Sequence, residues 1–351
     1  MKVMTRVPLD DWNASAAAAK RTEELGFHGL TSFEIDHDPF IPLAFAAMAT
    51  NKINLATAIA VAFPRSPMIT ATTAWDLQRQ SGGRFSLGIG SQVKGHNVRR
   101  FSVPWSAPVP RLREYIQSLR TIWECWERGD HKLQFEGEHY NFSLTTPEFS
   151  PDPTGLPMVP ISISAVGPAM LKLAGEVCDG VKLHLFCSRK YLEEVCLPQV
   201  EKGLAKNLVA RENFEIWGGG FVATGQDEQA VRTAMDEVRY RIAFYGSTRS
   251  YRPVLSLHGL DDLGDELHHM SVSGGWKNMA SLISDDVVEL FGAVGTYDTI
   301  VSAIEKRYGG LSDVINLDFP ENTDPGLVKG LLQDIDRIPT RFQNFKTQAA
   351  A

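Results

Sequence analysis

The sequence predicts a (β/α)8 barrel, in which eight parallel strands alternate with helices. Short apolar segments alternate with longer segments of helical periodicity along the chain, and this alternation occurs eight times. Eight such units are typical of a closed parallel barrel, although a doubly wound open sheet remains the alternative because alternation alone does not close a barrel. The length of 351 residues suits one barrel domain that spans residues 1–351 and carries insertions.

The first half of the chain contains four of the expected strand–helix units. Residues 11–26 are rich in alanine and end in glycine, which favours a helix with a defined end. Residues 109–127 place apolar side chains three and four positions apart, which predicts a long helix with one buried face. Expected strands cover residues 2–7, 29–33, 53–61 and 85–89, and the other expected helices cover residues 42–50 and 68–80.

The second half repeats this pattern with less regular connections. Gly218-Gly219-Gly220 interrupts the seventh expected strand, and the sequence offers no reason for the interruption. Two segments are expected to be insertions: about residues 130–157, irregular with a short hairpin at 133–140, and residues 246–292, rich in loops with short helical pieces. Expected strands cover residues 159–164, 180–186, 214–223 and 314–319, and expected helices cover residues 168–177, 191–207, 228–245, 297–308 and 325–335.

Composition and charge exclude several classes of protein. A net charge of −7 argues against a general nucleic-acid-binding protein. No apolar run approaches the roughly 18 residues of a membrane-spanning helix, and the first residues lack a secretion signal, so we expect a cytoplasmic protein without membrane association. The four cysteines form no C-x-x-C pair, and no His-x-His occurs near the first strand, so we expect no metal site.

The active site of such a barrel is expected at the C-terminal ends of the strands. The densest titratable group follows the second strand and comprises Glu34, Asp36, His37 and Asp38. A histidine beside carboxylates can act as an acid or a base, so His37 is a candidate for catalysis. Asp38 precedes Pro39 and is better explained as the N-terminal cap of the next helix.

Two further strand ends indicate a phosphate-bearing ligand. Residues 164–168 (SAVGP) join the fifth strand to a helix, whose free amides and dipole attract an anion. The neighbouring fourth strand ends at Gly90, where the missing side chain lets a ligand approach the backbone closely. His184 ends the sixth strand, where it is either a ligand contact or a hydrogen-bonded imidazole of the core.

Four motifs together resemble the bacterial luciferase-like superfamily, and most closely its branch that uses the deazaflavin coenzyme F420. They are Asp36-His37 after the second strand, residues 57–61 (TAIAV), residues 81–90 (SGGRFSLGIG) and residues 174–180 (AGEVCDG). The resemblance covers nearly the whole chain. The glycine-rich motif at residues 81–90 is specific for the superfamily but does not distinguish F420 from FMN.

The resemblance implies a cofactor ring stacked over the third strand, with a non-prolyl cis peptide near Ala60-Val61. It implies that His37 lies beside the ring as the acid or base, with Glu34 orienting it as the second catalytic residue. It also implies that Ser91 and Gln92 lie along the cofactor and that residues 165–167 hold its phosphate. The full set of expected cofactor-binding residues is Ala60, Val61, Gly90, Ser91, Gln92, Ser164, Ala165, Val166, Gly167 and His184.

The implied reaction is hydride transfer between C5 of the deazaflavin and a small organic substrate. Four aromatic loop residues suit a mostly hydrophobic substrate, although core packing explains them equally well: Trp105, Phe149, Trp276 and Phe319. An FMN-dependent monooxygenase that uses reduced flavin and oxygen is the alternative, and a non-catalytic flavin-binding protein is a third hypothesis. Analogy with the superfamily also suggests a homodimer.

Overall fold

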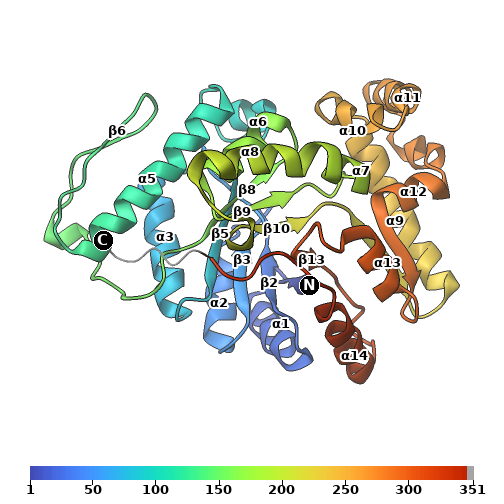
Figure 1. Ribbon diagram of the computed structural model, residues 1–351, viewed down its shortest axis with the longest axis horizontal. Coiled ribbons are helices and arrows are strands. Elements are labelled where there is room, and N and C mark those ends of the chain that lie inside the picture. The colour runs from blue at the N-terminus through green and yellow to red at the C-terminus, as the bar shows by residue number, and fades with distance from the viewer. Residues whose placement is uncertain (346–351) are drawn as a thin grey trace.

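The strands form a closed parallel barrel in the computed structural model, which describes residues 1–345 (Figure 1). β13 pairs with both β1 and β10, and an additional pairing of β3 with β5 closes the ring. The predicted (β/α)8 barrel is therefore confirmed. Within the described residues, its eight staves are β1 (Lys2–Arg6), β2 (Gly29–Ser32), β3 (Asn54–Thr57) continued by β4 (Ala60–Val61), β5 (Phe85–Gly90), β8 (Ile161–Ala165), β9 (Gly180–Leu183), β10 (Glu215–Gly218) and β13 (Val314–Asn316).

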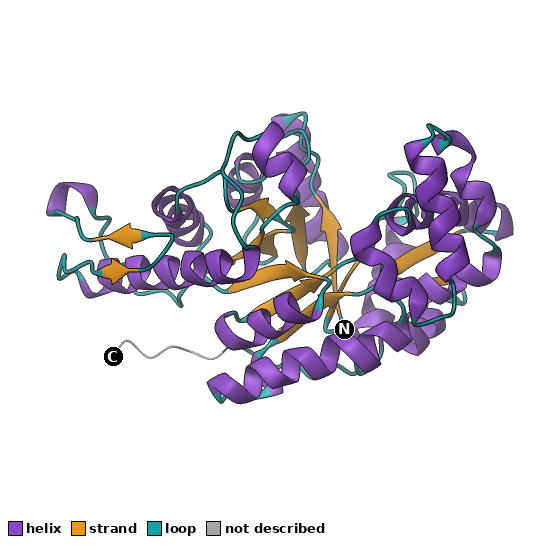
Figure 2. Ribbon diagram, turned by 90° about the horizontal axis from the view of Figure 1, so that it is seen from above, coloured by secondary structure: helices purple, strands orange, loops and turns teal. Residues whose placement is uncertain are grey.

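Helices surround this barrel on the outside, as Figure 2 shows. Asp11 caps α1 (Trp12–Leu25) by accepting hydrogen bonds from the amides of Asn13 and Ala14. α5 (Pro108–Arg128) buries one apolar face, as the residue spacing predicts. In residues 1–345, no helix combines the length and the apolar character that crossing a membrane requires. The other helices of this layer are α2 (Ile41–Ala49), α3 (Pro67–Gln80), α6 (Pro168–Val177), α8 (Leu197–Asn207), α13 (Ile300–Tyr308) and α14 (Pro325–Asp336).

The expected third strand, residues 53–61, is divided into two pieces. β3 ends at Thr57, and β4 resumes the barrel wall beside β5. The peptide bond between Ala58 and Ile59 is cis, just before the position that the resemblance implies. The division leaves the backbone of residues 60–61 at the C-terminal end of the barrel, where the cofactor ring is expected.

The expected seventh strand, residues 214–223, is in fact two strands in two sheets. β10 belongs to the barrel, whereas β11 (Phe221–Gly225) pairs with β12 (Gly292–Thr296), a strand that the sequence analysis did not predict. Gly218, Gly219 and Gly220 have φ values of 72°, 99° and 156°, which side-chain-bearing residues rarely adopt. These three glycines therefore turn the chain out of the barrel, which explains the interruption seen in the sequence.

The two insertions differ in how well the sequence predicted them. Residues 130–157 contain the expected hairpin, formed by β6 (Phe135–Glu136) and β7 (Asn141–Phe142), which projects beyond α5 in Figure 1, followed by η1 (Pro147–Phe149). Residues 246–292 are largely helical rather than rich in loops. Ser284 caps α12 through its side chain, and Asp261 and Asp262 place acidic groups in the first turn of α11. This region contains the end of α9 (Glu228–Gly246), then η4 (Arg249–Tyr251), α10 (Arg252–Ser256), α11 (Asp261–Val272), η5 (Trp276–Leu282) and α12 (Asp285–Phe291).

Two shorter segments also depart from expectation. The segment after β5, for which no helix was predicted, forms the helix α4 (Lys94–Arg99). The expected helix at residues 191–207 begins earlier and is not uniform. It consists of α7 (Arg189–Tyr191), the π-helical turn η2 (Leu192–Cys196) and α8.

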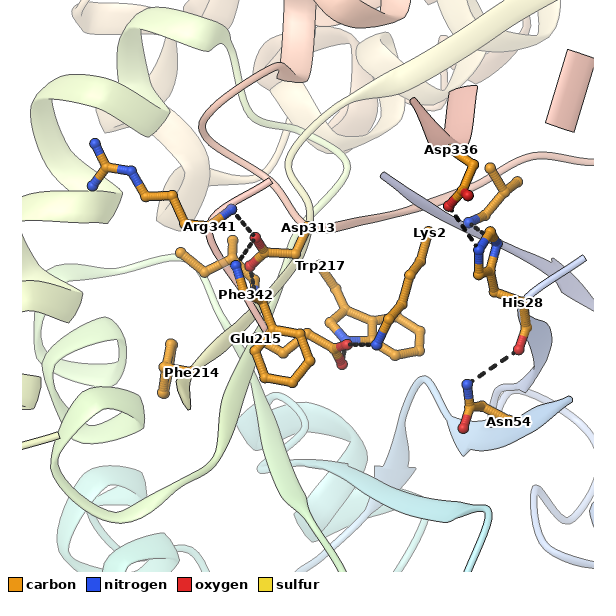
Figure 3. A network of polar contacts seen from close by, with 12 residues as sticks. Lys2, His28, Asn54, Phe214, Glu215, Trp217, Asp313, Asp336, Arg341 and Phe342 are labelled. Atoms are coloured by element: carbon orange, nitrogen blue, oxygen red, sulfur yellow. Dashed lines mark hydrogen bonds and ion pairs between the residues drawn. The ribbon is translucent and has the colours of Figure 1, made fainter. Parts of the chain in front are cut away.

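The N-terminal end of the barrel contains a network of paired charges (Figure 3). Lys2 Nζ lies 2.9 Å from Glu215 Oε1, and Trp217 Nε1 donates a hydrogen bond to the same carboxylate. Asp313 accepts the amides of Arg341 and Phe342, at 3.1 and 2.9 Å, which ties the C-terminal segment to this end. Paired charges at the N-terminal end of a barrel contribute to stability, whereas the functional site is expected at the opposite end.

Candidate functional site

Glu34 and Arg65 form a largely buried ion pair at the C-terminal ends of β2 and β4. Glu34 Oε2 lies 2.6 Å from Arg65 Nη1 and accepts a hydrogen bond of 2.7 Å from the Val61 amide. Arg65 Nη1 also donates to the Val61 carbonyl oxygen at 3.0 Å. The Glu34 side chain is only 9% exposed, so solvent screens the pair weakly. The two side chains together fix the backbone of residues 60–61.

His37 lies apart from this ion pair. Its side chain is 44% exposed, and its Nε2 lies 3.8 Å from Asp36 Oδ2. Within residues 1–345, Glu34 makes no hydrogen bond or ion pair with His37, and its Oε2 is engaged by Val61 and Arg65 instead. The orienting contact expected from Glu34 is thus replaced by a longer contact from Asp36.

Asp38 both caps a helix and reaches the ion pair. Its Oδ1 accepts hydrogen bonds from the amides of Phe40 at 2.8 Å and Ile41 at 3.1 Å, which confirms the predicted capping role at the start of α2. Its Oδ2 lies 3.3 Å from Arg65 Nη2. Arg65 therefore links the acidic segment after β2 to the segment after β4. Sequence reasoning gave Arg65 no role, although a cation following the third strand could have been matched to the acidic cluster following the second.

Gly90, at the end of β5, is closely surrounded by side chains of the neighbouring strands. A Cβ atom at Gly90 would lie 2.6 Å from Ser164 Oγ and 2.9 Å from Ile59 Cδ1. The space beside Gly90 is therefore filled by the protein itself, so a side chain at this position would disturb the packing. The same contact brings Gly90 and Ser164, on neighbouring strands, into one floor at the C-terminal end of the barrel.

Ser91 and Gln92 lead from β5 into α4. The Ser91 carbonyl oxygen accepts a hydrogen bond of 2.8 Å from Asn97 Nδ2. Gln92 has a φ of 57°, and its Oε1 accepts the amide of Val93 at 2.8 Å. Asn97 is completely buried, so it anchors this loop from within α4. Sequence reasoning missed Asn97, which stands among basic residues and belongs to no apolar pattern that would indicate burial.

The segment from Ala165 to Gly167 opens α6 as expected. Gly167 is the N-cap, and its carbonyl oxygen accepts the amides of Met170 and Leu171, each at 3.1 Å. A Cβ atom at Gly167 would meet no heavy atom within 4 Å, so the space beside this helix start is open. The first amides of a helix lack intrahelical acceptors and carry the positive end of its dipole. The residues present therefore fit a phosphate group. Tyr191 Oη donates a hydrogen bond of 3.3 Å to the Val166 carbonyl oxygen and so helps to fix this segment.

His184 follows β9 and lies between two tyrosine rings, one from α9 and one from η4. Its ring centroid lies 4.4 Å from that of Tyr245 and 4.7 Å from that of Tyr251, which stacks on it. Its Nδ1 accepts the Phe186 amide at 3.0 Å, and burial lowers the pKa of His184 to about 4. The imidazole is therefore neutral near pH 7 and carries its proton on Nε2. The sequence could not reveal the two tyrosines, which lie 61 and 67 positions further along the chain.

The aromatic residues suggested for a hydrophobic substrate are dispersed in the structure. Phe319 packs against Phe27 and Tyr297, with ring centroids 6.1 and 5.9 Å away, so core packing explains it. Trp276 contacts Phe244 on the outer side of α9. Phe149 is exposed on the hairpin insertion. The tyrosines beside His184 are therefore better placed to form an aromatic wall.

Comparison with known proteins gives consistent matches. A model of the luciferase-like monooxygenase family matches residues 2–313. The chain is 45% identical over 299 residues to an uncharacterized protein of Mycobacterium tuberculosis, which covers 85% of this chain and 88% of that protein. It is 27% identical over 304 residues to the 5,10-methylenetetrahydromethanopterin reductase of Archaeoglobus fulgidus, which covers 84% of this chain and 86% of the reductase.

Solved structures share the fold. The coenzyme F420-dependent tetrahydromethanopterin reductase of Methanopyrus kandleri superposes with a TM-score of 0.76 at 21% identity, over 96% of this chain and 97% of that chain. At this level of identity the superposition establishes a common barrel.

Proposed function

The chain belongs to the luciferase-like monooxygenase family, and we propose that it is an oxidoreductase that uses coenzyme F420 for hydride transfer to or from a small organic substrate. The observation that carries the proposal is the ion pair of Glu34 and Arg65, which fixes the backbone of residues 60–61 where a ring would stack. The reductase relatives from Archaeoglobus and Methanopyrus, the second of them F420-dependent, favour F420 over FMN.

The residues at the strand ends would divide the binding of such a cofactor between its ring and its phosphate. Ala60 and Val61 would lie along one face of the ring, above the floor formed by Gly90 and Ser164. Ser91 and Gln92 would line one edge. Ala165, Val166 and Gly167 would receive the phosphate at the start of α6, where the helix dipole favours a negative charge.

When bound, the deazaflavin would supply a hydride donor or acceptor at C5, whereas FMN would supply a reduced flavin that reacts with oxygen. His37, exposed at the rim beside Asp36, would donate or accept a proton on the substrate. His184 would offer its Nε2–H as a neutral hydrogen-bond donor, because Phe186 occupies Nδ1. Tyr245 and Tyr251 would exclude water beside it and favour a small hydrophobic substrate.

A second copy of the chain would suit the outer face of α2. This helix, IPLAFAAMA, contains no charged or polar side chain, yet Met48 on it is 86% exposed. Ile69 of the neighbouring α3 is also exposed, and Trp12 stacks on Phe45 at the edge of the same surface. Exposed apolar patches of this kind mark protein–protein interfaces, so we include a homodimer in the proposal.

Titration of the purified protein with F420 and, separately, with FMN tests the proposal. We expect saturable quenching of F420 fluorescence, and we expect the Arg65→Ala variant to bind F420 at least tenfold more weakly. A Glu24→Ala variant, which removes an exposed carboxylate from α1, serves as the matched control and should bind normally. FMN binding without F420 binding would favour the monooxygenase, and binding of neither cofactor would overturn the proposal.

A further inference from the structure

Lys182 is a buried amine in the middle of β9 that the proposed mechanism does not use. The residue is 6% exposed, and its Nζ has no hydrogen-bond partner among the described residues. The ammonium lies 2.9 Å from the centroid of the Trp217 ring. A buried charge without a hydrogen-bonding partner is costly, and a cation–π contact offsets only part of that cost. A negative charge nearby would therefore favour the protonated form of this amine.

The N-terminal side of Lys182 does not offer such a charge. Trp217 contacts the ammonium and also lines a cavity of about 300 Å³ at the N-terminal end of the barrel, which Lys182 itself does not line. The nearby carboxylate, Glu215, is already paired with Lys2 and with the indole N–H of Trp217 (Figure 3). Burial lowers the pKa of Lys182 to about 7 even though Glu215 acts in the opposite direction.

The C-terminal side of Lys182 leads directly to the floor of the candidate site. The lysine side chain crosses the barrel to β5, where its Cδ lies 3.0 Å from the position of a Cβ on Gly88. On β8, Ser164 is the register partner of Lys182. Gly90 is the next inward-facing position after Gly88, about 7 Å further along the strand. The ammonium thus lies one layer of side chains beneath the floor formed by Gly90 and Ser164.

We propose that Lys182 supplies the positive charge that balances the negative charge which the bound ring acquires on reduction, and this inference rests on the proposed function. A hydride equivalent brings two electrons and one proton, so the ring gains one negative charge unless a second proton follows. A cation one layer below stabilises that charge through the protein interior. At a separation of about 10 Å and an effective dielectric constant of about 20, the preference for the reduced form is roughly tenfold.

The test measures, under anaerobic conditions, the dissociation constants of the oxidised and the reduced form of each cofactor, FMN and F420. The wild type is compared with the Lys182→Met variant. For each cofactor, we expect the dissociation constant of the reduced form, divided by that of the oxidised form, to rise about tenfold in Lys182→Met. Lys329→Met removes an exposed lysine from α14 and should leave the ratio unchanged. An unchanged ratio in a folded Lys182→Met variant would overturn the inference.

A measurement on the wild type keeps the inference testable if that variant does not fold. NMR of protein labelled with ¹³C at the lysine Cε atoms reports the pKa of Lys182 directly. We expect that pKa to rise when the reduced cofactor binds and to change less with the oxidised one. Equal values with both forms would overturn the inference while leaving the proposed function intact, whereas failure of the wild type to bind either cofactor would overturn the proposed function itself.

Discussion

Removal of Glu34 is the perturbation that most directly tests how the candidate site is held together. In a Glu34→Ala variant the Arg65 guanidinium loses its charged acceptor at 2.6 Å, and the Val61 amide loses its acceptor at 2.7 Å. A hydrogen bond between charged groups contributes about 2 kcal/mol, and an unpaired buried amide costs about 1 kcal/mol. We therefore expect the free energy of unfolding to fall by about 3 kcal/mol.

The expected change in melting temperature follows from the size of the chain. An unfolding entropy of about 2.1 cal/mol/K per residue gives roughly 0.7 kcal/mol/K for 351 residues. A loss of 3 kcal/mol then lowers the melting temperature by about 4 °C, measurable by differential scanning calorimetry. Cofactor affinity should fall with it, because residues 60–61 are no longer fixed.

A double-mutant cycle with Arg65→Ala separates the ion pair from general destabilisation. The Arg65–Asp38 contact is longer, at 3.3 Å, so most of the coupling should be between Arg65 and Glu34. The double variant should lose about 2 kcal/mol less than the sum of the two single variants. Strictly additive losses, or a Glu34→Ala variant as stable as the Glu24→Ala control, would refute the reasoning.

Four further variants test other parts of the structure. The pKa of His184 is about 4 in the folded chain and 6.5 ordinarily, so protonation of His184 favours unfolding. The free energy of unfolding, measured by urea titration, should therefore fall from pH 6.5 towards pH 4. It should fall less steeply in the His184→Asn variant. Gly90→Ala should destabilise the fold by about 2 kcal/mol through its clash with Ser164, whereas Gly167→Ala should keep its melting temperature and lose only affinity for a phosphate-bearing cofactor. Burial lowers the pKa of Lys182 from 10.5 to about 7, so wild-type stability should rise with pH across that interval, and a Lys182→Met variant with the same slope would contradict this.

Most of the barrel could be predicted because its determinants are local. Apolar periodicity placed nearly every strand of the barrel and every helix of the outer layer. Asp38 was identified as a cap because it stands just before Pro39 and the expected helix, and it accepts two amides at the start of α2. The failures occurred where a local signal had two structural meanings. The three glycines at 218–220 suggested an interruption of one strand, whereas they separate two strands. The short helices in residues 246–292 resembled loops in the sequence.

The sequence by itself determined the fold class, the end of the barrel where a site could form, and the family motifs, because all of these depend on neighbours a few positions apart. Only the tertiary structure decided which side chains meet. Glu34 pairs with Arg65 across 31 positions, His184 packs against tyrosines more than 60 positions away, and the Lys182 amine contacts the Trp217 ring. These contacts depend on closure of the barrel and on strand register, which set distances that no local pattern encodes.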